Sequence, residues 1–300
     1  MICTEDKNCP LGKNEEMRKV LSYDILEVEP YINWLYFFHA WGLSGKSNEE
    51  KMRLKQEALS LLDSWNGVFQ THAIFRLLEA NGNDDDIWVY PDSGGDGTVS
   101  SGAVCIPMLR QQKVLTEGTP HLCLADFLRP KSQGVRDKLG LFCCTTDGEA
   151  VAQCRSDEYQ SMLAQTLCDR LAEATAERMH EEVRRHYWGY APNEQLTIEQ
   201  SHREEYQGIR PAVGYPSMPD ASMNFILDQL LDMKEVGIRL TETGMMVPHA
   251  SVSGLMFAHP KAHYFDVGAI GEDQLKDYAH RRGIPVELMR RFVQSYLMKK

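Results

Sequence analysis

The segment 206–220, YQGIRPAVGYPSMPD, restricts the fold more than any other part of this sequence. It holds two glycines and three prolines, and both residue types are unfavourable inside a helix or a strand. The prolines stiffen the backbone, whereas Gly208 and Gly214 permit tight turns and close approaches. We therefore expect a shaped loop here, in which side chains such as Arg210 and Tyr215 keep little freedom.

On either side of this loop, helical and strand patterns are partly separated along the chain. Helices are predicted at 48–65, 157–186, from 197, 222–233, 272–282 and 286–298, and strands within 68–109 and at 138–146, 240–247, 250–259 and 263–270. This partial separation predicts an α+β fold with one domain. Residues 1–25 are polar without a clear period, so they are expected to form a flexible lead-in, with a short element from Arg18 to Glu27 as the alternative, and the domain itself is expected at 26–300.

Charge and hydropathy argue against two classes of partner. The formal net charge of -11 repels phosphate backbones, and no apolar run is long enough to cross a membrane. The N-terminus also lacks the apolar stretch of a secretory signal. We therefore expect a cytoplasmic protein that binds neither nucleic acid nor membrane.

The densest basic cluster has the pattern of a solvated, ion-paired helix face. It alternates acidic and basic side chains at Glu177, Arg178, Glu181, Glu182, Arg184 and Arg185. A docking patch for an acidic partner is the alternative.

The eight cysteines form no C-x-x-C pair, the spacing on which most structural zinc sites depend. We expect no metal site and buried, reduced thiols. A hydrolase that uses Cys143 or Cys144 as its nucleophile is an alternative. Both thiols lie in the apolar run LGLFCCTT, where alternation would bury one thiol and leave the other without an identified base, so sheet packing is favoured.

Arg210 and the backbone near Ala212 give the loop a binding chemistry. The guanidinium of Arg210 is a planar fork of donors that suits a carboxylate, and backbone groups around Ala212 can meet an adenine edge or a ribose. An amino-acid nucleotide fits both features. The residues alone leave open an ordinary proline-rich connection with Arg210 in a structural salt bridge.

Several segments together carry a resemblance to a known family. They are INWLYFFHAWGL at 32–43, LADFLRP at 124–130, DRLAEATAE at 169–177, HYWGYAPNE at 186–194, REEYQGIRPAVGYP at 203–216, HASVSGLMFAHP at 249–260 and GEDQLKDYAHRRG at 271–283. In this order they resemble the activation domain of cobalamin-dependent methionine synthase. The resemblance covers roughly residues 23–295, and its signatures R-P-A-x-G-Y-P and Y-W-G-Y-A-P-N-E are specific.

The resemblance implies a single curved α+β domain with a long twisted antiparallel sheet flanked by helices. Proteins of that family use S-adenosylmethionine to remethylate a cobalamin that has slipped to the inert Co(II) state. An electron comes from flavodoxin or a similar reductase. The expected partners are therefore the cobalamin-binding module of methionine synthase, which holds the cobalamin, and a flavodoxin-like electron donor.

The resemblance also implies the residues of the ligand site. Arg210 is expected to hold the methionyl carboxylate and Ala212 to contact the nucleoside through its backbone. Tyr215 and Tyr264 are expected near the reacting methyl group, although from their apolar neighbours alone they could be plain core tyrosines. The full expected set is Asn33, Glu173, Glu204, Arg210, Ala212, Gly214, Tyr215 and Tyr264. Methyl transfer needs orientation and exclusion of water rather than a general base, so no catalytic residue is expected.

The chain departs from the family in three places. Asn33 stands where the family usually has an aspartate, which removes a charge-assisted contact with the ligand's ammonium. The residues after Pro219 read DASMN, where a histidine commonly follows the acid. Nothing resembles the homocysteine, folate or cobalamin modules, so we expect reactivation of separate modules, or a piece of a longer enzyme. The alternative function is a non-catalytic module that senses S-adenosylmethionine or caps a corrinoid protein.

Overall fold

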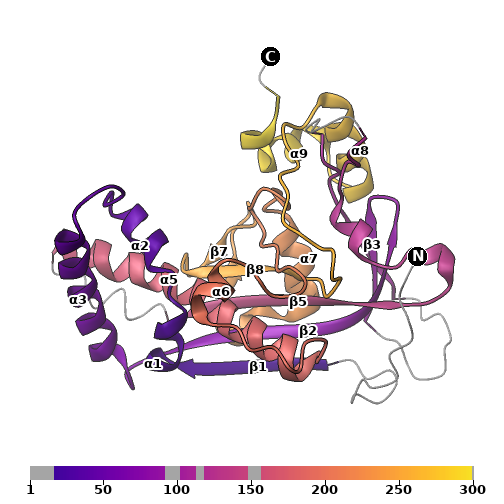
Figure 1. Cartoon of the computed structure of the whole chain (residues 1–300). Helices are drawn as coiled ribbons and strands as arrows, with labels where there is room; N and C mark the ends of the chain where they lie inside the picture. Colours follow the sequence, from indigo (N-terminus) through magenta and orange to yellow (C-terminus); the bar gives the residue numbers. More distant parts are fainter. Residues whose placement is uncertain (1–16, 92–101, 113–117, 148–156, 299–300) are drawn as a thin grey trace.

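The computed structural model describes residues 17–91, 102–112, 118–147 and 157–298. Its centre is a curved, fully antiparallel sheet in the order β4-β3-β2-β5-β8, with β1 paired to the first half of β2 (Figure 1). The strands are β1 Met17–Asp24, β2 Gln70–Asn83, β3 Asp86–Tyr90, β4 Val104–Pro107, β5 Asp137–Thr146 and β8 Ser251–Met256. A separate small hairpin joins β6 Arg239–Leu240 to β7 Met246–Val247.

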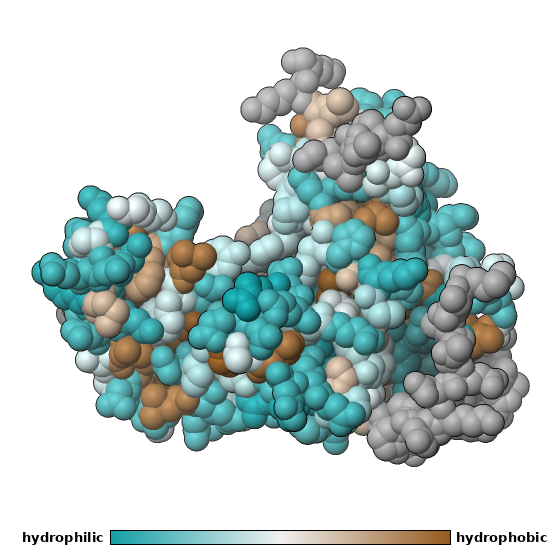
Figure 2. All heavy atoms as spheres, in the orientation of Figure 1, coloured by the Kyte–Doolittle hydropathy of each residue, from teal (hydrophilic) through white to brown (hydrophobic). Residues whose placement is uncertain are grey.

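Helices flank the sheet and gather at its two ends. They are α1 Ile25–Val28, α2 Trp34–Ala40, α3 Asn48–Trp65, α5 Glu158–Glu182, α6 Ile198–His202, α7 Met223–Leu231, α8 Glu272–Arg282 and α9 Val286–Phe292. Figure 1 places α2 and α3 at one end and α8 and α9 at the other, and the surface is hollowed between them (Figure 2). No helix in the described ranges is long and apolar enough to cross a membrane.

Local signals explain where the two longest helices begin. Ser47 caps α3, since its hydroxyl accepts from the N–H of Glu50 while the Glu50 carboxylate accepts from the N–H of Ser47. Asp157 caps α5 by accepting from the N–H of Tyr159. After Glu182, α5 continues as a short π-helical stretch, Val183–Tyr187.

The sheet is buried on both faces because helices cover each of them. Phe142 and Cys144 pack on the side of α5, whereas Leu141 and Cys143 pack on the side of α7. The expectation of buried, reduced thiols in a packed sheet is therefore confirmed for this pair, since both are fully buried and free. Burial raises the pKa of Cys143 to about 12 and that of Cys144 well above its ordinary value, which argues against a thiolate nucleophile. Cys3, Cys9 and Cys154 lie outside the described residues.

The loop 206–220 lies along the free edge of β8 as an irregular additional strand. Ile209 and Phe257 exchange two backbone hydrogen bonds of 3.0 and 2.9 Å, Leu255 donates to Pro211, and Val213 donates to Ser253. Two glycines make this approach possible. A Cβ on Gly254 would lie 2.2 Å from the carbonyl oxygen of Pro211, and one on Gly208 would lie 2.1 Å from that of Phe257.

The α+β prediction with a long curved antiparallel sheet is confirmed, and the helices predicted at 48–65 and 272–282 have the predicted bounds. The strand predicted at 263–270 is wrong, because this segment forms only one isolated bridge, at Ile270, and no ladder. Within the lead-in predicted at 1–25, residues 17–24 form β1, which agrees with the alternative of a short element there; only Tyr23 of that strand is buried, so no apolar pattern marked it. Residues 1–16 lie outside the described residues.

Replacing Gly254 with alanine should weaken the docking of the loop on β8. We expect Gly254→Ala to lower the free energy of unfolding by about 1–3 kcal/mol, because the new methyl group meets backbone atoms that cannot give way. Gly271→Ala is the matched control, since its Cβ would approach most closely only the flexible carboxylate of Asp273. Urea unfolding midpoints check this, and equal midpoints for the two variants would contradict it.

Candidate functional site

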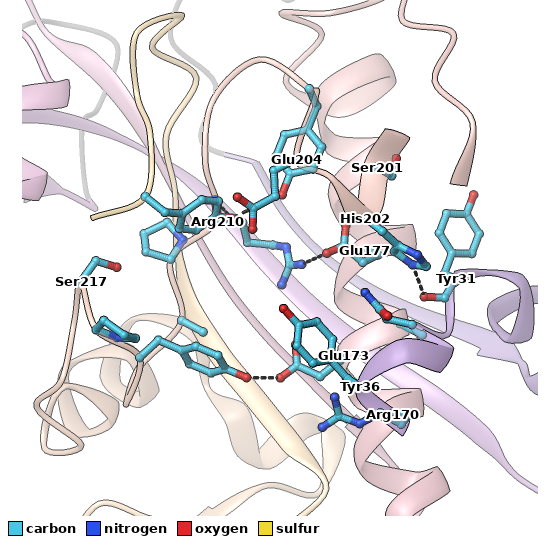
Figure 3. A pocket seen from close by; sticks show the side chains of 18 of the residues that line it. Tyr31, Tyr36, Arg170, Glu173, Glu177, Ser201, His202, Glu204, Arg210 and Ser217 are labelled. Atoms are coloured by element: carbon cyan, nitrogen blue, oxygen red, sulfur yellow. Dashed lines mark hydrogen bonds and ion pairs between the residues drawn. The ribbon is translucent and has the colours of Figure 1, made fainter. Parts of the chain in front are cut away.

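A cavity of about 560 Å³ lies between α5 and the loop 206–220, which is the size of a small-molecule site (Figure 3). Residues that are far apart in sequence form its wall. They are Tyr31, Asn33, Tyr36, Arg170, Glu173, Ala174, Glu177, Ser201, His202, Glu204, Tyr206, Arg210, Pro211, Ala212, Tyr215, Pro216, Ser217, Tyr264, Phe265 and Asp266.

Arg210 is the buried cation of this cavity, with 7% of its surface exposed. Its Nη2 donates to Oε1 of Glu177 at 2.5 Å, and its backbone N–H donates to the hydroxyl of Tyr264 at 2.9 Å. Its buried Nε has no hydrogen-bond partner within the described chain. Burial alone would lower the pKa of Arg210, but Glu177 and its other acidic neighbours raise it, so the charge is retained. Arg210 thus forms a structural ion pair through Nη2 and still has the N–H of Nε available to donate to a ligand.

Acidic side chains oppose Arg210 from two elements. Glu173 and Glu177 lie one turn apart on the same face of α5, and Glu204 reaches the cavity from the segment after α6 (Figure 3). Glu204 adopts a φ of 59°, a left-handed conformation that is costly for a side chain of this type and recurs at functional sites. Partial burial raises the pKa of the Glu204 carboxyl, and the charge of Glu177 raises it further, although Arg210 opposes both effects.

Tyrosines supply much of the remaining wall. Tyr206 and Tyr264 are inner wall residues whose hydroxyl oxygens lie 3.3 Å apart. Tyr215 stands at the rim with 49% of its surface exposed, and its hydroxyl donates to Glu173 at 2.7 Å. Burial and Glu173 both raise the pKa of Tyr215, so its hydroxyl stays protonated as a donor.

Asn33 lines the cavity but is already engaged. Its side-chain oxygen accepts from the N–H of Leu35 at 3.1 Å and so caps the start of α2. A ligand group at Asn33 therefore shares this oxygen with the helix.

Ala212 and Gly214 take different places. The hydrogen bonds on either side of the Ala212–Gly254 bridge direct the N–H and C=O of Ala212 away from β8, and this carbonyl accepts from Tyr215 at 3.3 Å. Gly214, with a φ of 89°, lines a neighbouring cavity of about 280 Å³ instead of the main one. The pair Tyr215–Glu173 contributes to both cavities.

The structure brings together all the residues expected from the sequence except Gly214. Sequence reasoning missed Glu177, the ionic partner of Arg210, although it follows Glu173 by four residues on a predicted helix and so had to share its face. Tyr206, Arg170 and His202 were also missed; Tyr206 opens the predicted loop 206–220, whereas nothing in the local pattern marked the other two. No group of three or more histidine, cysteine or acidic side chains in the described ranges is arranged to hold a metal ion.

The prediction of a solvated, ion-paired face is wrong for one arginine. Arg178 pairs with Glu27 and Glu182 and Arg185 pairs with Glu181, all on partly exposed side chains. Arg184, by contrast, is 1% exposed and forms a buried pair with Glu194 at 2.6 Å. Arg184 follows the fully buried His180 by four residues and so shares its inward face, which the alternating charges of the segment did not indicate.

The model of the "Vitamin B12 dependent methionine synthase, activation domain" matches residues 24–283. This chain belongs to that family. A solved structure, the crystal structure of the MetH reactivation domain bound to AdoHcy, is similar to this activation domain at 36% identity and a TM-score of 0.85. The match covers 95% of this chain and 91% of the solved one, so the resemblance in the sequence is confirmed for fold and family alike.

Replacing Glu204 with glutamine should stabilise the ligand-free protein at neutral pH. The neutral side chain removes the repulsion from Glu177 and the partial desolvation of a charge, and we expect a gain of about 0.2–1 kcal/mol. The pKa of Glu204 is raised on folding, so its cost is present above this pKa and disappears as the carboxyl is protonated at lower pH. The gain of Glu204→Gln over wild type should therefore shrink on acidification in thermal melts, and a gain that grows on acidification would contradict this.

Proposed function

We propose that this activation domain binds S-adenosylmethionine in the 560 Å³ cavity and presents its methyl group to a cobalamin held by a separate module of methionine synthase. The observation that carries the proposal is Arg210. A buried guanidinium with an unpartnered Nε is suited to a carboxylate, which the methionyl end of the ligand provides. The solved relative, described as bound to AdoHcy, supports the same class of ligand.

The charges of the wall suit the rest of the ligand. Glu173, Glu177 and Glu204 form an acidic side that attracts the ammonium and the sulfonium, and tyrosine faces add to this attraction. The outward-facing N–H of Ala212 is suited to the nucleoside. Arg210 keeps Glu177 partly neutralised, so the acidic side does not repel the ligand's carboxylate.

The reaction we propose is reductive remethylation of cob(II)alamin. A flavodoxin-like donor provides one electron, bound S-adenosylmethionine supplies the methyl group, and S-adenosylhomocysteine is released. The residues of this chain orient the methyl group through the Tyr215 and Tyr264 walls and keep water from it. No proton has to move for this displacement, which agrees with a cavity in which Tyr215 stays protonated and Glu177 pairs with Arg210.

Calorimetric titration with S-adenosylmethionine tests the assignment of Arg210. Removal of this cation alone would leave Glu177 without its partner, so we choose Arg210→Met/Glu177→Gln, which removes both charges of the pair. We expect this variant to fold and to bind S-adenosylmethionine roughly 10- to 100-fold more weakly, which is about 1.5–3 kcal/mol for a charge-assisted hydrogen bond. Glu177→Gln alone is the control, because it keeps the guanidinium.

The same titration tests Asn33. Asn33→Asp restores a carboxylate at the start of α2 and should tighten binding by up to about tenfold, since a charged acceptor contacts the ligand's ammonium more strongly. Tight binding by Arg210→Met/Glu177→Gln would show that the carboxylate lies elsewhere. No binding by wild type or by Asn33→Asp would refute the ligand itself.

A second candidate function is a sensing or capping module that binds the ligand without transferring its methyl group. The capping bond from Leu35 to Asn33 favours it, because the uncharged side-chain oxygen of Asn33 is shared with the helix and so makes a weaker contact with the ligand's ammonium. Stopped-flow measurement of methylcobalamin formation with a corrinoid-binding module and a chemical reductant distinguishes the two. We expect methylcobalamin to form faster with this chain than in the same mixture without it. Equal rates with and without this chain would favour the sensing function.

A further inference from the structure

A second buried ionic cluster lies directly behind the ligand cavity. It consists of His180 and Arg184 at the end of α5, Glu194 in the segment that follows, and Tyr206 at the start of the loop. Tyr206 alone of these residues reaches the cavity, so the others cannot contact a ligand there. Their arrangement nevertheless bears on the site.

Arg184 makes contacts in three directions. Its Nε and Nη2 donate to the carboxylate of Glu194 at 2.6 to 3.1 Å, in a forked pair that is almost entirely buried. Its Nη1 donates to Nδ1 of His180 at 2.9 Å. The flat face of the guanidinium lies 4.2 Å from the ring centre of Tyr206. The fork and the stack together leave Arg184 a single orientation.

His180 fixes a second side of Tyr206. Its ring meets that of Tyr206 edge-on at 5.0 Å and 87°, and it is fully buried. Nδ1 accepts from Arg184, so the ring is neutral, in agreement with a pKa that burial and then Arg184 lower well below its ordinary value. The ring of Tyr206 is thus held between a guanidinium and an imidazole.

From Tyr206 a short chain of contacts leads to the binding residues. The hydroxyl of Tyr206 lies 3.3 Å from that of Tyr264, and the latter accepts the backbone N–H of Arg210. The same Arg210 carries the unpartnered Nε. A displacement of Tyr206 would therefore change both the cavity wall and the placement of the guanidinium.

We infer that Arg184 and Glu194 are positioning residues for the ligand site, which act through Tyr206 on Tyr264 and on the main chain of Arg210. This rests on the proposed function only for the identity of the ligand. A buried ion pair contributes little net stability compared with apolar side chains of similar volume, so geometry rather than stability is its role here. The pair stands outside the cavity, and its effect on affinity has to pass through Tyr206.

A thermodynamic cycle tests this route. Arg184→Met/Glu194→Met removes both charges with similar volume, and we expect it to remain folded but to bind S-adenosylmethionine at least tenfold more weakly. Tyr206→Ala should weaken binding to a similar extent. The triple variant that combines it with Arg184→Met/Glu194→Met should bind only slightly more weakly than the double variant, because both changes act through Tyr206. Additive losses, or wild-type affinity in the double variant, would overturn the inference.

Two further measurements separate this outcome from instability and from failure of the proposed function. Arg18→Met/Glu235→Met removes an ion pair of the same 2.6 Å length, which joins β1 to the segment 233–236 away from the cavity, and should bind as wild type does. Hydrogen exchange of residues 206–217 in ligand-free protein needs no ligand. It should speed up in Arg184→Met/Glu194→Met and not in the Arg18 control, and equal exchange in both would also overturn the inference.

Should the double variant not fold, Arg184→Lys replaces it, because lysine keeps the charge but loses the fork and the stack. If wild type binds no S-adenosylmethionine, the proposed function fails and the exchange result alone decides the positioning role.

Discussion

The pairing of the loop 206–220 with the edge of β8 is the interaction on which the site depends. Four backbone hydrogen bonds hold the loop there, and Gly208 and Gly254 provide the space that two approaching backbones need. This pairing sets Arg210 opposite α5, where Glu177 can meet it, and leaves the following turn to carry Tyr215 to the rim. Binding chemistry thus comes from an irregular strand that is fixed as firmly as a regular one.

Much of the fold could be predicted from local signals in the sequence. Site residues could be predicted only where their own segment marked them. The helix Asn48–Trp65 carries its own capping box and apolar spacing, so its bounds followed from the sequence. The segment 263–270 has β-forming residues, but its backbone bonds go to separate segments near Gln112, Pro216 and Tyr296 and form only one isolated bridge. Arg210 stood out because glycine and proline surround it, whereas Glu177 and Tyr206 become site residues only through tertiary contacts. Arg184 faces inward because it follows the buried His180 by one helical turn, although its charged neighbours are typical of a solvated face.

Each of the two buried arginines near the site is matched to one glutamate, and the two pairs have different roles. Glu177 takes one edge of Arg210 and leaves Nε free, so this cation is held in place while part of its hydrogen-bonding capacity remains for a ligand. Glu194 takes the fork of Arg184 and His180 takes its other nitrogen, so each of the three nitrogens of that cation has a partner within the protein. The Arg210–Glu177 pair is therefore suited to binding a ligand, and the Arg184–Glu194 pair is suited to holding its neighbours in place.

The long strand β2 has a mechanical consequence. Over its 14 residues it pairs with β5 along one edge and with β1 and then β3 along the other. The two ends of the molecule are therefore connected through one hydrogen-bonded sheet. Opening the hollow seen in Figure 2 would require bending that ladder rather than turning a hinge. The hollow should therefore keep its width. A large partner that binds there has to match its curvature.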